Sequence, residues 1–501
     1  MKKFTKIFFA VAALAVGFSC TTDTTEDLVA KPAGQTTLTL SLEESRTQLG
    51  EAVAGIYPVT WSYGDEISVN GVKSSSIEIL ENGTCAKFTF GDVLSYPYAI
   101  AYPAAQSGKV VFADVQPQTA GTFTNGAAAM YGYAESTGAI SMKHLTGILK
   151  FGVTGSTAIS RVQISTVDRK PIAGEFELNF ATGDMTVFDL NAKYTIDCTF
   201  EESADGDAGM VLSSTPYYFH FAVPAGEYNE LYVTIYENSG SVMYATIKAG
   251  DTKPLVAGNV REFSNTIAYK ANADLFVIYD KQSLKNFASA AATLDKDAVV
   301  VDDIDMTGVE WAPVEGFGGY IFDGGEFEIK GLSAPLFGST AAHIKNVKLT
   351  DVAMEITEGA FSGTIACELL GGSLNNCSAA GTYNINNTTL VLESFTNLYN
   401  DIGHGGLVGR ANGATIYNCT NNLDITATSF CAADFSCKAS IGGVVGASEN
   451  SSKFNSLTNN GDVVYNGTTQ KANVYMSGIV GKKSNVSGMA YIAEFSNCTN
   501  N

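Results

Sequence analysis

The stretch that decides the fold of the second half of this chain is Gly405-Gly406-Leu407-Val408-Gly409. The pattern recurs at offsets of 37 and 35 residues, as Gly-Gly-Val-Val-Gly at 442–446 and Ser-Gly-Ile-Val-Gly at 477–481. A second element follows each copy, as Ile-Tyr-Asn-Cys-Thr-Asn-Asn at 416–422, Phe-Asn-Ser-Leu-Thr-Asn-Asn at 454–460 and Phe-Ser-Asn-Cys-Thr-Asn-Asn at 495–501. Two motifs that keep one order at a period of about 40 residues predict a solenoid, because each coil buries its apolar face only against its neighbours.

More degenerate copies of the two elements occur upstream, as Ala-Pro-Leu-Phe-Gly at 334–338 and Asn-Asn-Cys at 375–377. We therefore expect residues 297–501 to form a right-handed parallel β-helix. Its glycines would suit positions that need a positive φ or a close backbone approach. The sequence stops at Asn501, before the strand that followed this element in the two earlier copies, which predicts a fragment or an unusual terminus.

The first half of the chain has the pattern of antiparallel strands. Leu38, Leu40 and Leu42 alternate with polar residues, which is the period-two signature of a strand with one buried face. Similar alternation occurs around 162–167 and 231–235. The fold class is therefore all-β, and we expect two β-sandwiches, at residues 36–145 and 146–270.

Residues 271–296 are expected to be a linker with one short helix. Capping residues at Asp280-Lys281-Gln282-Ser283 stand before a helically spaced apolar set, Leu284, Phe287, Ala288, Ala291 and Leu294.

Several motifs in the first half carry a family resemblance when they are taken together and in order. They are Arg46-Thr47, Trp-Ser-Tyr-Gly-Asp-Glu-Ile at 61–67, Tyr102-Pro103, and Tyr-Phe-His-Phe-Ala-Val-Pro at 218–224 followed by the strand at 231–235. Over about residues 36–269 the chain resembles the fimbrillin-like surface proteins of Bacteroidota. The resemblance implies a pair of transthyretin-like β-sandwiches and a role as a pilus subunit, pilus tip or related surface adhesin.

The glycine-flanked repeats of the second half resemble the GLUG-type repeats of bacterial surface adhesins. The segment Asp302-Asp303-Ile304-Asp305-Met306, with Trp311-Ala312-Pro313 after it, is similar to the usual opening of such regions.

The N-terminus predicts export. Three lysines, at positions 2, 3 and 6, precede an apolar run from Ile7 to Val16, which is too short to span a bilayer. Residues 1–19 are therefore expected to be a removed signal peptide. Cys20 follows Gly17-Phe18-Ser19 and resembles the lipidated cysteine of bacterial lipoproteins, with residues 20–35 as a tether. Acidic residues after it, Asp23, Glu26 and Asp27, resemble the signal that sends such lipoproteins to the outer face of the outer membrane.

Charge and residue usage exclude several classes of partner and site. The formal charge is −21, and removal of three signal lysines makes it −24, which disfavours nucleic acid as a partner. The four histidines are far apart and there is no Cys-x-x-Cys pair, so we expect no metal site and no cofactor.

The repeated cysteines and asparagines have structural interpretations. Leu457 replaces the cysteine found at Cys377, Cys419 and Cys498, which indicates an apolar packing position. Cys431 and Cys437 could bridge, but their spacing cannot show it. The aligned pairs are expected to form stacked turn ladders, with ligand contact as the alternative: Asn421-Asn422, Asn459-Asn460 and Asn500-Asn501.

Several acidic residues are candidate sites for calcium binding or catalysis. Asp302, Asp303 and Asp305 lack the glycine and distal glutamate of a calcium loop, so a solvated strand entry is favoured over calcium binding. Asp65 and Glu66 are expected in a turn. Asp424 and Asp462 recur in step, as structural residues would, and no hydrolase or phosphate-binding motif occurs, so we expect no enzyme. A β-helix enzyme acting on glycans is the lesser alternative.

Arg46 is a candidate site of proteolytic processing. In fimbrial relatives, a cut after an arginine frees a sheet edge that a neighbour's strand fills. Two functions therefore stay open besides the enzyme. The first is a surface adhesin that binds a host or microbial glycan or protein through its solenoid, and the second is a fimbrial subunit or tip that assembles with other subunits by strand exchange.

Overall fold

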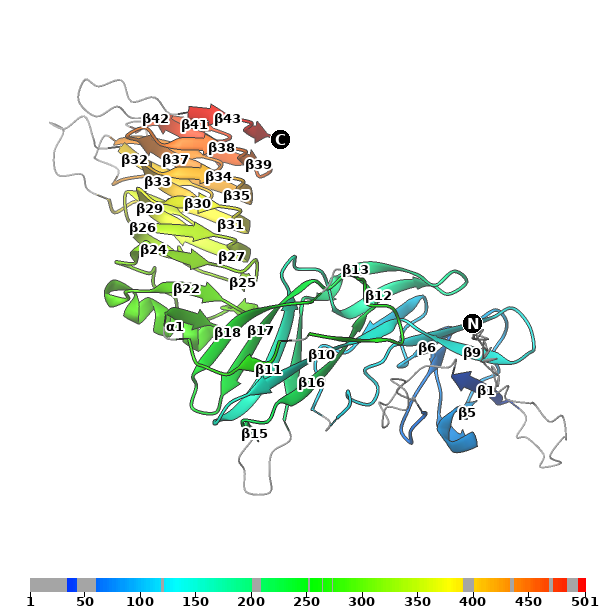
Figure 1. Ribbon diagram of the computed structural model, residues 1–501. Helices are drawn as coiled ribbons and strands as arrows, with labels where there is room; N and C mark the ends of the chain where they lie inside the picture. The colour runs from blue at the N-terminus through cyan, green and yellow to red at the C-terminus, as the bar shows by residue number, and fades with distance from the viewer. Residues whose placement is uncertain are drawn as a thin grey trace, which may run out of the picture. The chain divides into compact units, whose positions relative to one another are not determined.

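The computed structural model describes residues 34–42, 60–118, 121–200, 209–250, 253–263, 265–272, 274–390, 401–432, 437–467, 472–483 and 494–501. In this part the chain is nearly all β and has one α-helix. No helix in these ranges is long and apolar enough to cross a membrane. The chain divides into two compact units, Met1–Lys270 and Ala271–Asn501 (Figure 1). The all-β expectation is confirmed.

The first unit contains four sheets. The largest has, in spatial order, β3 (Val72–Lys73), β2 (Ser68–Val69), β6 (Tyr98–Tyr102), β8 (Met130–Ala134), β9 (Ile140–His144), β1 (Thr36–Leu42), β5 (Cys85–Phe90) and β4 (Ser76–Leu80). A second contains β16 (Tyr217–Pro224), β10 (Thr146–Thr154), β19 (Val260–Glu262) and β20 (Ile267–Ala268). The third contains β14 (Thr195–Thr199), β11 (Ala158–Thr166), β17 (Glu230–Glu237), β18 (Val242–Lys248) and β15 (Met210–Val211). The fourth contains β13 (Asp184–Lys193), β12 (Ala173–Asn179) and β7 (Lys109–Phe112), and a 3-10 turn, η1 (Glu81–Gly83), precedes β5.

Strand β1 lies inside the largest sheet, between β5 and β9. It pairs antiparallel with β5 from Thr36 to Ser41 and parallel with β9 from Leu40 to Leu42. Leu40 is fully buried, and Leu38 and Leu42 pack against the same core. The alternation of leucine with threonine and serine therefore produces one buried face, as the sequence predicts.

The Trp-Ser-Tyr-Gly-Asp segment has a structural role in this core. Trp61 is buried and meets the rings of Phe88 and Tyr102 edge-on, with centroids 5.0 and 5.2 Å away. Asp65 is 5% exposed and accepts hydrogen bonds from the Ser62 amide and the Tyr102 hydroxyl, both at 2.7 Å. Burial raises the pKa of this carboxyl. Asp65 is thus more than a turn residue, because it joins the turn to β6.

The two halves of the first unit share a sheet. β7 comes from the range 36–145, but it pairs antiparallel with β12 from the range 146–270, with Phe112 opposite Gly174. Phe112 and Phe176 meet edge-on in the core of the second half. The two halves therefore cannot separate without breaking backbone hydrogen bonds.

The segment 271–296 is not a linker, which corrects the expectation from sequence. It contributes β21 (Leu275–Ile278), which pairs in parallel with β22 (Asp297–Val300) of the second unit. Helix α1 (Lys281–Ala290) begins at the predicted cap, because Asp280 accepts a hydrogen bond from the Ser283 amide at 2.7 Å. A 3-10 turn, η2 (Ala291–Thr293), follows, and Phe287 is fully buried.

The second unit, here called the repeat unit, consists of parallel sheets. The first contains β21, β22, β24 (Gly318–Asp323), β26 (Phe337–Lys345), β30 (Ser373–Asn375), β34 (Thr415–Tyr417), β38 (Lys453–Asn455) and β43 (Glu494–Ser496), and continues from β26 into β29 (Ala366–Leu370), β33 (Val408–Asn412), β37 (Val445–Glu449) and β42 (Val480–Lys483). The second contains β23 (Ile304–Asp305), β25 (Glu328–Lys330), β27 (Lys348–Ile356), β31 (Ser378–Asn386), β35 (Thr420–Ser429), β39 (Thr458–Asn459), β44 (Thr499–Asn500) and β40 (Val463–Tyr465). The third contains β28 (Phe361–Gly363), β32 (Asp401–Gly405), β36 (Cys437–Gly442) and β41 (Ala472–Ser477).

The strand register matches the repeats found in the sequence. Gly405 lies opposite Gly442, which lies opposite Ser477, and Asn421 lies opposite Asn459. In Figure 1 the equivalent strands lie in rows, such as β29, β33, β37 and β42. The degenerate copy at 334–338 is also in register, because Phe337 pairs with Ala366 and Ala366 with Val408. A further copy at 363–367 is not visible in the sequence, because only Gly363 of its first glycine pair remains.

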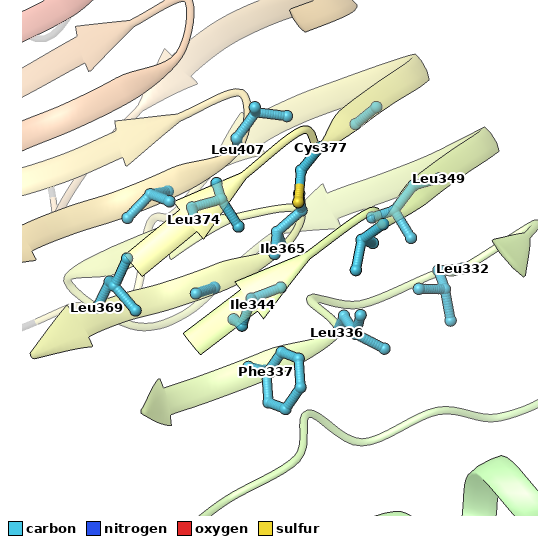
Figure 2. Packing of buried hydrophobic residues seen from close by; sticks show 14 of the residues in the cluster. Leu332, Leu336, Phe337, Ile344, Leu349, Ile365, Leu369, Leu374, Cys377 and Leu407 are labelled. Atoms are coloured by element: carbon cyan, nitrogen blue, oxygen red, sulfur yellow. The ribbon is translucent and has the colours of Figure 1, made fainter. Parts of the chain in front are cut away.

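Apolar side chains of equivalent positions form columns inside the repeat unit (Figure 2). One column contains Leu336, Ile365, Leu407 and Val444, and another contains Ile344, Leu374, Ile416 and Phe454, all buried. Each coil therefore covers the apolar face of the coil before it, which is the arrangement that the period predicts.

The motif glycines are required by close backbone approach. None of Gly405, Gly406 and Gly409 has a positive φ. A Cβ on Gly405 would lie 2.2 Å from the carbonyl oxygen of Val408, and a Cβ on Gly406 would lie 2.2 Å from that of Gly443. A larger side chain would therefore push neighbouring strands apart.

We expect Gly406→Ala to lower the free energy of unfolding of the repeat unit by about 3 kcal/mol, since its methyl group meets backbone atoms that cannot move alone. Urea denaturation followed by circular dichroism measures the loss. Gly371→Asn is the control, because that glycine faces open space at φ +75°, where asparagine is tolerated. Equal stability of Gly406→Ala and the wild type would contradict the packing argument.

Candidate interaction face

The outer face of β27, β31 and β35 is the candidate functional surface, and we call it the polar face. Its exposed side chains alternate with buried ones along each strand. Ala353 lies beside Thr382 and Thr382 beside Asp424, while Glu355 lies beside Asn384 and Asn384 beside Thr426. The result is a regular array of mostly polar side chains on a parallel sheet, with strands about 4.8 Å apart.

The centre of the polar face has unused hydrogen-bonding groups. Within the described residues, the side chains of Thr382, Asn384 and Thr426 make no hydrogen bond, and Glu355 makes no ion pair. At the margin the groups are paired, because Lys348 contacts Glu328 at 2.6 Å and Lys330 contacts Asp351 at 3.2 Å. The centre is thus free to bind an outside partner.

Ion pairs join neighbouring coils on the first sheet of the repeat unit. On the sheet of β24 to β43, Lys345 contacts Asp323 at 2.9 Å and Lys453 contacts Glu494 at 3.3 Å. On its branch through β29 and β33, Arg410 pairs with Glu368 and lies over the ring of Phe361 at 4.3 Å. These charged groups have partners within the repeat unit, unlike the carboxylate of Glu355, which makes no ion pair among the described residues.

The aligned asparagine pairs form two ladders. In the buried ladder, the amide of Asn421 donates to Asn459 at 2.7 Å, and that of Asn459 donates to Asn500 at 2.8 Å. In the exposed ladder, Asn460 donates to Asn422 at 2.7 Å and Asn501 donates to Asn460. The buried ladder packs against the motif glycines, since a Cβ on Gly406 would meet Asn421 at 2.4 Å. Stacking is therefore observed, and it links the two sequence motifs.

The turn itself lies at another asparagine position. Five residues between the first and second sheets have a positive φ between 52° and 55°, and they are Asn346, Asn376, Asn418, Ser456 and Asn497. Asparagine is favoured there because its side chain tolerates the left-handed region. The expectation that the aligned pairs make the turns is corrected, because the turn precedes them in each coil. The sequence signal was the asparagine or serine before each repeated Cys or Leu.

The repeated cysteine position belongs to the core. Cys377, Cys419 and Leu457 are at most 2% exposed in one apolar cluster, and Cys498 packs partly against it. A position that is filled by leucine or cysteine in successive coils is a packing position.

The acidic segment 302–305, which ends in β23, caps backbone groups. The Asp303 carboxylate accepts a hydrogen bond from the Glu328 amide at 2.8 Å, and that of Asp305 accepts one from the Thr307 amide at 2.9 Å. The bonds to Thr307 lower the pKa of Asp305. No cluster of three or more metal-ligating side chains occurs among the described residues. Asp424 lies on the polar face and accepts a hydrogen bond from the Asp462 amide at 3.1 Å.

His404 is a buried group that the sequence did not single out. It is fully buried, its ring stacks on Phe430 with centroids 5.9 Å apart, and neither ring nitrogen has a hydrogen-bond partner in the described chain. Burial lowers the pKa of this imidazole to about 3. Ile441 occupies the equivalent position in the next coil. His404 is therefore a neutral packing residue.

A hollow in the first unit has paired charges. It is lined by Thr166, Val167, Asp168, Lys170, Glu227, Asn229 and Glu230. Lys170 contacts Asp168 at 2.7 Å, and Lys248 contacts Glu230 at 2.6 Å. These ion pairs occupy two of its three carboxylates. Cys20 and Arg46, the predicted lipidation and processing sites, lie outside the described residues.

Comparison with known proteins leaves the family open. No protein-family model matches the chain, and no curated protein matches it. Among solved structures, an IgA1 protease aligns with 70% of this chain at 15% identity and a TM-score of 0.31, and the alignment spans 24% of that protein. A candidate cell adhesion protein from Bacteroides fragilis aligns with 46% of this chain and 95% of its own length, at 11% identity and a TM-score of 0.23. A fimbrial assembly protein from Parabacteroides distasonis aligns with 42% of this chain and 99% of its own length, at 10% identity and a TM-score of 0.17. Similarity at this level does not establish a shared fold, so the functional argument uses the chain's own geometry.

We expect acid to destabilise the repeat unit through His404. The pKa of the His404 imidazole is lower in the folded state than its usual value of about 6.5. As the pH falls, the unfolded chain therefore binds a proton on this residue before the folded chain does. This contribution to stability is complete above about pH 6.5 and declines as the pH falls toward about 3. The free energy of unfolding therefore falls by about 2 kcal/mol between pH 7 and pH 4.5 because of this residue.

His404→Ile, which copies the next coil, is expected to remove that part of the pH dependence. Trp311 fluorescence follows urea unfolding of the repeat unit in a Trp61→Phe background, where it is the only tryptophan. The matched reference is Trp61→Phe alone. An unchanged difference between the two pH values would show that His404 does not titrate as described.

Proposed function

We propose that this protein is a cell-surface adhesin that binds its ligand through the polar face of the repeat unit. The observation that carries the proposal is the centre of that face, where Thr382, Asn384 and Thr426 make no side-chain hydrogen bond within the described part of the chain. The carboxylate of Glu355, beside them, makes no ion pair there. A rigid parallel sheet holds these groups in fixed register, so a ligand would meet them without a cost for ordering a loop.

The proposed architecture combines the two sequence resemblances. The repeat unit would be a right-handed parallel β-helix of GLUG type, supported by the parallel pairing of equivalent strands. The first unit would be a fimbrillin-like pair of transthyretin-like β-sandwiches that serves as base. A lipid on Cys20 would anchor the protein in the outer membrane, facing outward, as the signal segment and the acidic residues after it suggest.

The expected ligand is a host or microbial surface glycan or protein, and the protein is expected not to be an enzyme. Short amide and hydroxyl groups both donate and accept hydrogen bonds, which suits the hydroxyls of an extended sugar chain or the amides of a peptide. The net charge of −21 disfavours nucleic acid.

The first experiment applies residues 29–501 to arrays of glycans and matrix proteins. A truncation after Lys270, which keeps the first unit, is the control for binding outside the repeat unit. We expect saturable binding by the longer chain and none by the truncation.

The double variant Thr382→Arg/Asn384→Arg is expected to weaken that binding at least tenfold, because two long side chains cover the centre of the polar face. The matched control is Thr415→Arg, which changes an exposed threonine on β34 of the neighbouring sheet and should bind like the wild type. If the double variant binds as tightly as the wild type, the polar face is not the binding site. If the wild type binds no ligand on the arrays, the adhesin function is wrong.

A second function is favoured by the position of β1. This strand is internal to its sheet, and a cut after Arg46 would separate it and the lipid from the folded unit. Its loss would expose the edges of β5 and β9 and the apolar cavity around Leu40, which an added strand from another subunit would fill. This is assembly by strand exchange, as in a fimbrial subunit or tip.

Cleavage with a trypsin-like protease after Arg46 is expected to convert the monomer into polymers, which light scattering with size-exclusion chromatography detects. Arg46→Gln is the uncut control and should stay monomeric. A chain that is cut after Arg46, confirmed by N-terminal sequencing, and yet remains monomeric would exclude this mode of assembly.

A further inference from the structure

Cys431 and Cys437 lie in contact inside the repeat unit. Their sulfur atoms are 2.6 Å apart, and the two residues are 1% and 5% exposed. No disulfide bond joins the two residues in this structure. They differ from the cysteines of the repeated core position, because they occur together in one coil and have no cysteine counterparts in the neighbouring coils.

Ordered elements on each side hold the two cysteines in place. After Cys431, the Ala432 amide donates a hydrogen bond to the Leu390 carbonyl at 3.0 Å, and the Ser429 hydroxyl donates to the Cys431 carbonyl at 3.2 Å. Cys437 begins β36 and pairs with Ala472 of β41. The contact between the sulfurs is therefore determined by the packing of β35 and β36, which are parts of the parallel sheets.

We propose that Cys431 and Cys437 form a disulfide bond that ties the end of β35 to the start of β36. Next to this bond, Phe430 stacks on His404 at 5.9 Å and on Tyr465 at 5.4 Å. The bond would therefore hold Phe430 over the third sheet and stabilise the coil against opening. It closes a short loop, so it favours the folded state by limiting the unfolded chain.

The bond forms by thiol–disulfide exchange with a small-molecule disulfide. One cysteine thiolate attacks a sulfur of the oxidant and expels one thiol, and the thiolate of the other cysteine then attacks the mixed disulfide and expels the second. The protein loses two protons and two electrons, and the oxidant is reduced to two thiols. Export, which belongs to the proposed function, supplies an oxidising compartment, but the chemistry can be tested without it.

Burial favours oxidation during folding over oxidation afterwards. It raises the pKa of the Cys437 thiol to about 12, so the folded protein contains little of the reactive thiolate. Once formed, the bond is covered, and reductants would reach it slowly for the same reason.

The test refolds residues 29–501 with a mixture of reduced and oxidised glutathione, and then labels free thiols with a maleimide in denaturant. This chain has eight cysteines, and we expect two fewer labels without prior reduction than with it. Trypsin would release residues 411–438 as one peptide that contains Cys419, Cys431 and Cys437. Its fragmentation spectrum should show an internal bond between the last two.

Two variants separate this pair from other pairings. Cys431→Ser should take up the same number of labels with and without prior reduction. Cys498→Ser should still take up two fewer labels without prior reduction. The oxidised wild type should melt roughly 5 °C above its reduced form. Full labelling of Cys431 and Cys437 in the unreduced wild-type peptide would overturn the proposal, and this measurement does not depend on whether a variant folds or whether the protein binds a ligand.

Discussion

The repeat unit depends on the contact between backbones of neighbouring strands at its glycines. Gly406 and Gly443 leave no room for a Cβ, because the carbonyl oxygen of the next coil and an asparagine amide occupy that space. The same approach brings the side-chain amide of Asn421 close enough to donate a hydrogen bond to the amide oxygen of Asn459 in the interior. A buried amide without a partner would cost about 1–3 kcal/mol, so the ladder is stable only while the coils keep their register.

This register also explains why the candidate binding face is regular. Buried residues such as Tyr383 and Ile425 alternate with exposed ones along β31 and β35, so a shift of one residue would expose the core. The positions of Thr382, Asn384 and Thr426 follow from that constraint. Stability and the presentation of polar groups thus have one origin, and the carboxylate of Glu355 is held by the same packing.

The first unit is organised around β1 and Asp65. β1 supplies a central strand from a point close to the N-terminus, so the order of strands in the sheet differs from their order in the chain. Asp65 links the turn after Trp61 to Tyr102 on β6, which explains why the Trp-Ser-Tyr-Gly-Asp and Tyr-Pro motifs occur together. Local propensity predicts neither the pairing of β1 with β5 and β9 nor the bond between Asp65 and Tyr102, because each joins residues that are distant in sequence.

The all-β class, the helix cap at Asp280 and the register of the repeats can be read from the sequence, because they depend on local pattern and on a repeat period. Only the tertiary structure shows that β21 belongs to the repeat unit, that His404 is buried with no hydrogen-bond partner among the described residues, and that Cys431 meets Cys437. A short apolar run, one histidine and two cysteines have the same local appearance in many environments. Their roles are set by which strands lie beside them, and only the folded chain specifies those neighbours.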